Sequence, residues 1–232
     1  PDGRLELVSL LDEEGCRTSV QTNLIFNGNF FHVHSKALLS NIVLVYKSIV
    51  CLLCYTHFSA SRNGCTGRPT RIPIDFGGYF DVAPLDAGEN LRRDICLTME
   101  QMGMAPQHSH HESGNGQNEI DCHHAGPLKT ADNVMMFKQI VRAVAMRSGI
   151  HASFLPKPLA DQAGSGLHIN LSLYMDGRNL FEGDIAPDSI AGSFMAGVLA
   201  HSRELTVFTN PLPNSYLRFG CDEAPRYVRW SR

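Results

Sequence analysis

One short stretch constrains the fold more than any other, a polar cluster from His108 to His124 that is centred on Asn115-Gly116. An Asn-Gly pair is the strongest short signal for a β-hairpin, because a type I′ turn needs positive φ at both central residues. With that turn, three pairs of polar side chains face each other on one side of the hairpin: Glu112 and Glu119, His110 and Asp121, and His108 and His123. The sequence therefore predicts an antiparallel strand pair with a polar face.

The pair Glu112 and Glu119 brings two carboxylates together. Side chains directly opposite across an antiparallel pair have Cβ atoms about 4.5–5.5 Å apart, where like charges are destabilising. A divalent cation would neutralise both groups, and carboxylate oxygens favour Mg²⁺ or Mn²⁺ over Zn²⁺. Strand alternation puts Cys122 on the opposite face, which weakens a zinc interpretation. We predict a magnesium or manganese site here; the alternative is a solvated hairpin that binds no ion.

The chain from Gly77 onward shows a regular pattern of helices and strands. Apolar residues at helical spacing, ended by glycine, predict helices over about 88–102 and 130–148, and a third helix is predicted from Asp188. Runs of strand character predict strands over about 106–113, 117–124, 150–155, 166–174 and 226–231. Helices interspersed with hairpins indicate an α+β domain with a largely antiparallel sheet.

Composition narrows the classes of function. The chain has 232 residues, 43% of them hydrophobic, with 20 Lys and Arg against 23 Asp and Glu and a formal net charge of −3. This length allows one large domain or two small ones. An acidic balance without a long basic block argues against gripping nucleic acid by its phosphates. Seven cysteines, an odd number spread irregularly, fit a reducing compartment, and we expect a cytoplasmic protein.

Residues 1–66 differ from the rest and form an unassigned segment. They contain an apolar run from Leu38 to Tyr55 that Lys47 and several other polar residues interrupt. A lysine in mid-span costs roughly 2.5–3.5 kcal/mol on insertion into a membrane, so we do not expect a membrane span. The run is better explained as a buried strand pair or helix, or as a segment foreign to the domain that follows. Residues 56–71 have the composition of a linker.

A second polar cluster lies over residues 164–173. Strand alternation places His168, Asn170 and Ser172 on one face and leucine and isoleucine on the other. The Gly164-Ser165-Gly166 segment before the strand allows close backbone approach to a phosphate or carboxylate, although a simple turn has the same composition. This row is a candidate ligand-binding face.

A third cluster lies in residues 210–225, which we predict to be a long irregular loop. Arg218 could bind a carboxylate or phosphate through two hydrogen bonds. Glu223 could take a proton or bind a cation. The alternative is an exposed Arg and Glu in a proline-rich turn.

The three clusters, in this order and spacing, resemble the catalytic domain of type I glutamine synthetases from about Gly67 to Arg232. Eight segments carry the resemblance: Gly77–Asp81, His110–Glu112 with Gly116–Glu119, Pro156–Pro158, Gly164–His168, Thr209–Pro211 with Asn214–Tyr216, and Glu223–Pro225. The resemblance implies a truncated domain over 67–232, with a curved, largely antiparallel sheet backed by helices of the glutamine synthetase/guanidino kinase-like type. It also implies a ligase that joins glutamate to ammonia or another small amine, using ATP and Mg²⁺ or Mn²⁺.

The family's residue roles carry over to matching positions of this chain. The reaction of the family passes through a γ-glutamyl phosphate held between divalent cations. The resemblance makes Glu112 and Glu119 ligands of one cation, His168 a ligand of the second, Gly164 and Arg218 part of the glutamate site, Asn170 and Ser172 part of the nucleotide site, and Tyr79, Arg218 and Glu223 catalytic residues. Complete enzymes of this type form dodecamers with sites at subunit interfaces.

The sequence also departs from the family pattern. Ala163 stands where the family commonly has Asn, and Asn170 stands where it has a second His. We recognise neither the family's amino-terminal β-grasp domain nor its Glu-x-Glu strand in residues 1–66, and the last arginines and metal Glu are expected beyond Arg232. We therefore expect almost no ligase activity from this polypeptide alone. The alternative to an enzyme is a catalytically silent scaffold or fragment that keeps only part of the nucleotide and metal site.

Overall fold

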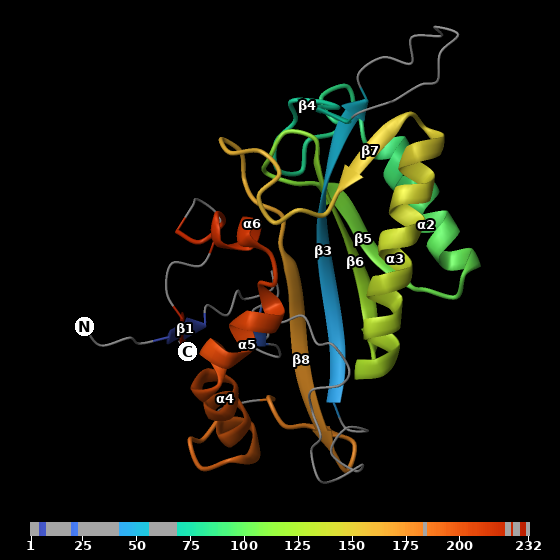
Figure 1. Cartoon of the computed structure of the whole chain (residues 1–232). Helices are drawn as coiled ribbons and strands as arrows, with labels where there is room; N and C mark the ends of the chain where they lie inside the picture. Colours follow the sequence, from blue (N-terminus) through green and yellow to red (C-terminus); the bar gives the residue numbers. More distant parts are fainter. Residues whose placement is uncertain are drawn as a thin grey trace, which may run out of the picture. The chain divides into compact units, whose positions relative to one another are not determined.

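The computed structural model describes residues Leu5–Leu7, Val20–Thr22, 42–55, 69–182, 185–220, 224 and 228–230, with side chains from Ile72 onward except at 228–230. Within these ranges the chain is an α+β protein with antiparallel strands and helices (Figure 1). It divides into two compact units, which are described separately. Unit 1 contains residues 1–46, 124–132 and 167–232, and unit 2 contains residues 47–123 and 133–166.

The sheet of unit 2 is built around the long strand β3 (Ile42–Tyr55), which begins in unit 1 and continues into unit 2. This strand pairs antiparallel with β4 (Pro69–Pro73) and β7 (Ile150–Ser153). It also neighbours β6 (Gln117–Ala125), which in turn pairs antiparallel with β5 (Pro106–His111). The apolar run of the sequence is thus largely a strand, and no helix in the described part of the chain is long and apolar enough to cross a membrane.

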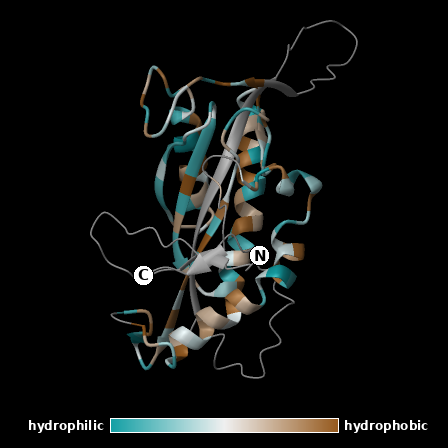
Figure 2. Cartoon of the chain, turned by 90° about the vertical axis from the view of Figure 1, so that its left-hand side faces the viewer, coloured by the Kyte–Doolittle hydropathy of each residue, from teal (hydrophilic) through white to brown (hydrophobic). Residues whose placement is uncertain are grey.

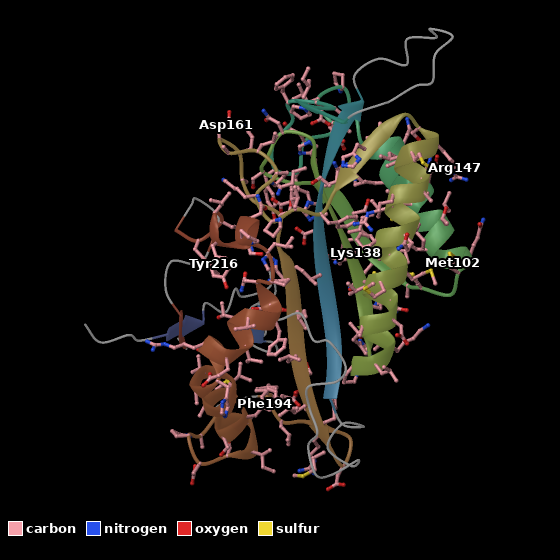
Figure 3. All side chains as sticks on the ribbon, in the orientation of Figure 1. Met102, Lys138, Arg147, Asp161, Phe194 and Tyr216 are labelled. Carbon is pink, nitrogen blue, oxygen red and sulfur yellow. The ribbon has the colours of Figure 1, made fainter. Side chains whose placement is uncertain are left out.

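Two amphipathic helices cover unit 2. Helix α2 (Glu89–Gln101) buries three residues at helical spacing, Leu91, Ile95 and Met99, and packs against β5, as the predicted helix over 88–102 requires. Met102, just past its end, is half exposed (Figure 3). Gly103 follows with φ 75°, a left-handed conformation that ends helices and suits glycine.

Helix α3 (Pro127–Arg147) begins three residues earlier than predicted. The prediction took Thr130 as the cap, but proline is tolerated in the first helical turn, where its missing N–H has no intrahelical partner. The buried face of α3 contains Phe137, Ile140, Val141 and Val144. Figure 1 shows α2 and α3 on the same side of β5 and β6, and Figure 2 shows hydrophobic and hydrophilic residues alternating around the helices.

Unit 1 is organised around β8 (Leu167–Met175), which pairs antiparallel with β2 (Val20–Thr22) and with β9 (Arg178–Asn179). The apolar row of β8 packs against α4 (Ile190–Ala200) and α5 (Ser202–Thr209), with Phe194 of α4 in contact (Figure 3). Helix α4 begins after Ser189, whose hydroxyl accepts from the Gly192 amide, rather than at Asp188 as predicted. A separate parallel pair joins β1 (Leu5–Leu7) and β10 (Val228–Trp230).

The β5–β6 hairpin differs from the prediction in its register. His110 pairs with Glu119 and His111 with Asn118, and the Glu112 amide donates to the Gln117 carbonyl over 2.8 Å. The loop therefore has four residues, 113–116, and the predicted pairing of Glu112 opposite Glu119 is wrong by two residues. Within the turn only Gly116 has positive φ, 62°, so a two-residue type I′ turn cannot form. A shift of two residues keeps the side chains of residues 109–112 and 117–120 on their predicted faces, whereas the register changes again between Pro106 and Ser109.

Candidate cation site on the hairpin

The polar face of the hairpin gathers three potential cation ligands. One ligand atom each from His110, Glu112 and Glu119 lies within 4.8 Å of the others. His110 Nε2 is 4.0 Å from a carboxylate oxygen of Glu119. The two predicted ligands Glu112 and Glu119 are thus brought together despite the changed register, because diagonal neighbours on one face remain within reach.

Glu119 is the most perturbed acid of this group. It is 4% exposed, and burial raises its pKa to about 9, with contributions from the neighbouring carboxyl groups of Asp121 and Glu112. Loss of hydration disfavours the charged form, and so do the two nearby acids. A dication among these groups would reverse both effects. The donor set of two carboxylates and an imidazole fits Mg²⁺ or Mn²⁺, since hard oxygen ligands dominate it.

Two aromatic side chains cover His110. The Phe80 ring stacks on the imidazole with centroids 4.3 Å apart, and Tyr79 meets His110 edge to face at 5.7 Å. Phe80 adopts φ 59°, and its amide donates to the His111 carbonyl over 3.0 Å. A bulky residue at positive φ is uncommon and costs energy that its surroundings must offset. The loop that contains Tyr79 and Phe80 thus holds Tyr79, a predicted catalytic residue, beside the candidate cation ligand His110.

The turn of the hairpin is bonded to the loop that contains Gly164. Gln117 is 2% exposed, and its amide oxygen accepts from the Gly114 N–H over 2.9 Å while its amide nitrogen donates to the Gly164 carbonyl over 3.0 Å. The Asn115 amide donates to Gln162 in the same loop. The structure therefore places Gly164, which we predicted to bind glutamate, next to the turn that connects Glu112 to Glu119.

The other predicted site residues belong to unit 1. His168, Asn170 and Ser172 lie in β8, where the alternation predicted from the sequence holds: Ile169, Leu171 and Leu173 are buried in the helix-covered core. Asn170 is 9% exposed, and no hydrogen bond reaches its amide oxygen in the described structure.

Arg218 follows the short helix α6 (Pro213–Tyr216) within the predicted irregular loop. Burial lowers the pKa of Arg218, and its Nε finds no hydrogen-bond partner among the described residues. Glu223 lies outside the described residues.

Sequence reasoning did not assign His110 or Gln117 to the site. Two adjacent histidines without a known ligand spacing are usually surface or core residues. The sequence nevertheless contained a usable signal for His110. In every pairing register that differs from the predicted one by an even number of residues, His110 lies on the same face as Glu112 and Glu119. Gln117 gave no such signal, since its bond to the Gly164 carbonyl joins residues 47 positions apart in the chain.

The fold and this cluster define an α+β protein with a partly buried acidic site on a β-hairpin. Residues 50–232 match the family model described as glutamine synthetase, catalytic domain. The glutamine synthetases of Clostridium saccharobutylicum and Pyrococcus furiosus are 47% and 45% identical over 169 and 157 residues, covering 71% and 67% of this chain and 38% and 36% of theirs. The chain belongs to the glutamine synthetase family, a family of ligases, and contains part of its catalytic domain.

Solved structures agree with this assignment of fold. The chain superimposes on a cryo-EM structure of Plasmodium falciparum glutamine synthetase with a TM-score of 0.65 and 24% identity, covering 78% of this chain and 40% of that one. A ligand-free structure of GmaS gives a TM-score of 0.61 at 32% identity, covering 78% and 43%. The chain thus spans about two-fifths of the length of the relatives that it matches.

Proposed function

We propose that this chain is part of an ATP-dependent ligase that joins glutamate to ammonia or another small amine. The observation that carries the proposal is the convergence of His110, Glu112 and Glu119 within 4.8 Å, in a chain whose relatives are glutamine synthetases. A γ-carboxylate oxygen of glutamate attacks the γ-phosphorus of ATP and ADP leaves. The amine then attacks the acyl carbon, phosphate leaves, and an amide forms.

The residues of unit 2 have distinct tasks in this proposal. Glu112, Glu119 and His110 hold one Mg²⁺ or Mn²⁺, which supplies charge neutralisation of phosphoryl oxygens when bound. The Gly164 backbone lines the amino-acid site, and its bond to Gln117 fixes it relative to the hairpin. Tyr79, 63% exposed beside His110, lines the pocket for the amine.

The residues outside unit 2 complete the proposal. His168 holds the second cation, and Asn170 and Ser172 contact the nucleotide. Arg218 binds the glutamate carboxylate; its buried Nε is a donor suited to a planar anion. Glu223 closes the site and takes the proton of ammonium. A cytoplasmic location and dodecameric assembly belong to the same proposal.

The alternative is a catalytically silent protein that retains part of the cation and nucleotide site. Both possibilities predict cation binding at the hairpin. They differ only in turnover.

Two measurements on the 232-residue chain test the proposal. The first is Mn²⁺ binding, followed by electron paramagnetic resonance, for the unmodified chain, Glu119→Gln and the exposed control Glu100→Gln. We expect Glu119→Gln alone to weaken binding by about 100-fold, since it removes a charged ligand. The second is γ-glutamyl transfer and ATP-dependent ligation, alone and with flanking sequence supplied from a relative. Equal Mn²⁺ affinity in all three proteins would refute the site, and inactivity in both forms would favour the silent scaffold.

A further inference from the structure

A second buried polar cluster lies beneath the hairpin, formed by Asp75, Asp86, Arg92, His111 and Asn118. All five are at most 7% exposed. Ligand atoms of Asp75, Asp86 and His111 lie within 4.8 Å of one another, which by itself would suit a metal. Their hydrogen bonds indicate a different use.

The acids of this cluster are already saturated with donors. Both oxygens of Asp86 accept from the guanidinium of Arg92, over 3.0 and 2.6 Å, and one also accepts from the Gly88 amide. The Arg92 side chain lowers the pKa of Asp86 against the opposing effect of burial. Because Arg92 neutralises Asp86, a dication at this position would meet a cation. The cluster is therefore a hydrogen-bonded support rather than a metal site.

Asp75 connects three backbone segments. Its Oδ1 accepts from the amides of Gly116, over 2.8 Å, and Gly77, over 3.4 Å, and its Oδ2 accepts from the Ala87 amide over 3.0 Å. Gly116 is the one residue of the hairpin turn with positive φ. Asp75 thus holds the turn in the four-residue form that sets the register of Glu112 and Glu119.

His111 continues this connection to a candidate ligand. Its Nε2 lies 2.9 Å from Asp75 Oδ1, and its Nδ1 lies 2.6 Å from the carbonyl oxygen of Glu112. A carbonyl can only accept, so Nδ1 carries the hydrogen of that bond. The ring is fully buried, and a Cβ added at Gly77 would come within 3.0 Å of Nε2, so the surroundings leave no room for another orientation.

Arg92 and Asn118 support the second strand in the same way. Arg92 donates to the side-chain oxygen of Asn118, and the Asn118 amide nitrogen donates to the Gly116 carbonyl over 3.0 Å. Asn118 directly precedes Glu119. Each candidate carboxylate ligand therefore directly follows a residue that this cluster holds by hydrogen bonds: Glu112 follows His111, and Glu119 follows Asn118.

We infer that Asp75 and His111 are positioning residues of the hairpin cation site: Asp75 fixes the turn through Gly116 and orients His111, and His111 fixes Glu112 through its carbonyl. This inference rests on the proposed function, because it assigns the network a task only if the hairpin binds a cation. Groups that orient metal ligands through hydrogen bonds typically contribute 10–100-fold to metal affinity.

The test compares Mn²⁺ affinity and the Mn²⁺ resonance spectrum of the 232-residue chain and four variants. His111→Gln keeps an amide near Nε2 and loses the bond to Glu112, whereas His111→Asn keeps a donor near Nδ1. Asp75→Asn removes the charge that binds the turn. Asp81→Asn is the matched control, since Asp81 accepts only from Gly78 within its own loop among the hydrogen bonds described.

We expect Asp75→Asn and His111→Gln to weaken Mn²⁺ binding by about 10–100-fold, with an altered spectrum. His111→Asn should recover most of the loss, and Asp81→Asn should match the unmodified chain. Equal affinity in the unmodified chain, Asp75→Asn and His111→Gln would overturn the inference, and so would an Asn variant as weak as the Gln variant. Equal Mn²⁺ affinity in the unmodified chain and in Glu119→Gln would instead refute the proposed function and, with it, the task of the network.

A variant that retains every polar group guards against a failure to fold. Gly77→Ala places a methyl group against the His111 ring without removing a hydrogen-bonding side chain. We expect weaker Mn²⁺ binding and faster hydrogen exchange at the Gly116 amide, measured without metal. Unchanged exchange at Gly116 in both Gly77→Ala and Asp75→Asn would show that the network does not fix the turn, and would overturn the inference.

Discussion

The β5–β6 hairpin of unit 2 and strand β8 of unit 1 each have a polar face, yet the two polar faces are built differently. On the hairpin, the Gln117 side chain accepts from the Gly114 amide and donates to the Gly164 carbonyl, so both ends of its amide group are bonded. On β8, Asn170 is also buried, at 9% exposed, but its amide oxygen has no hydrogen bond in the described part of the chain.

This difference distinguishes the hairpin turn, whose polar groups are bonded within unit 2, from the polar row of β8, where a buried amide oxygen still needs a hydrogen-bond donor. A buried polar atom without a partner costs about 1–3 kcal/mol, so such atoms mark positions where something else is to bind. The turn that Gln117 bonds should therefore keep its geometry without ligands. The polar row of β8 should respond to nucleotide more than the hairpin does.

The largest losses of stability should come from truncating buried apolar side chains. Ile120 behind the hairpin and Leu171 in β8 are at most 1% exposed, so Ile120→Ala and Leu171→Ala should each lower the free energy of unfolding by about 2–5 kcal/mol. Only Ile120→Ala should also weaken Mn²⁺ binding by the folded protein, because Ile120 lies between Glu119 and Asp121 in the strand. Denaturant titration and Mn²⁺ titration check the two expectations. Equal loss of Mn²⁺ affinity in both variants would remove the distinction between the regions.

The next effect is a pH dependence specific to the hairpin. The folded chain holds a proton on Glu119 up to about pH 9, whereas the unfolded chain releases it near pH 4.5. The stabilising contribution of this proton is complete below about pH 4.5 and is lost as the pH rises through about 9. Mn²⁺ must displace the proton, so its affinity should rise by up to about tenfold per pH unit from pH 6 to 8.

Two measurements check this dependence. Denaturant titrations between pH 5 and 9 should show metal-free stability falling with pH in the unmodified chain, and less so in Glu119→Gln, which cannot ionise. Glu100→Gln on the exposed side of α2 should behave like the unmodified chain. Mn²⁺ affinity that is flat between pH 6 and 8 would show that Glu119 is already ionised without metal.

Some of this arrangement could be predicted from the sequence, because its causes are local. The alternation in β8 and the spacing in α2 predict the buried faces correctly, since burial of one face fixes strand and helix periodicity. The faces of Glu112 and Glu119 were also correct. The register was not, because Asp75, 41 residues from Gly116, selects the four-residue loop. The supporting role of His111 depends on the same distant carboxylate, and no local pattern marks it.

A smaller effect tests the bond between hairpin and loop. Gln117→Leu would leave the Gly114 amide and the Gly164 carbonyl without their present partner, at a cost of about 1–3 kcal/mol in unfolding free energy. Hydrogen exchange at Gly114 should accelerate. Ser172→Ala on β8 serves as the comparison and should change stability less. A Gln117→Leu protein as stable as the unmodified chain would mean that water replaces both bonds.

The smallest change in stability should come from Asn170. Asn170→Ala removes a buried amide whose oxygen has no described partner, so the relieved desolvation offsets the lost packing and the free energy of unfolding should change by less than about 0.5 kcal/mol. If the polar row of β8 contacts the nucleotide, the same variant should weaken ADP binding several-fold, as measured by calorimetry with Mn²⁺ present. Asn170→His, which places an imidazole where the family resemblance predicts one, should bind ADP at least as well as the unmodified chain. A large loss of stability with unchanged ADP affinity would instead make Asn170 a structural residue, and β8 would then resemble the hairpin in organising its polar face by itself.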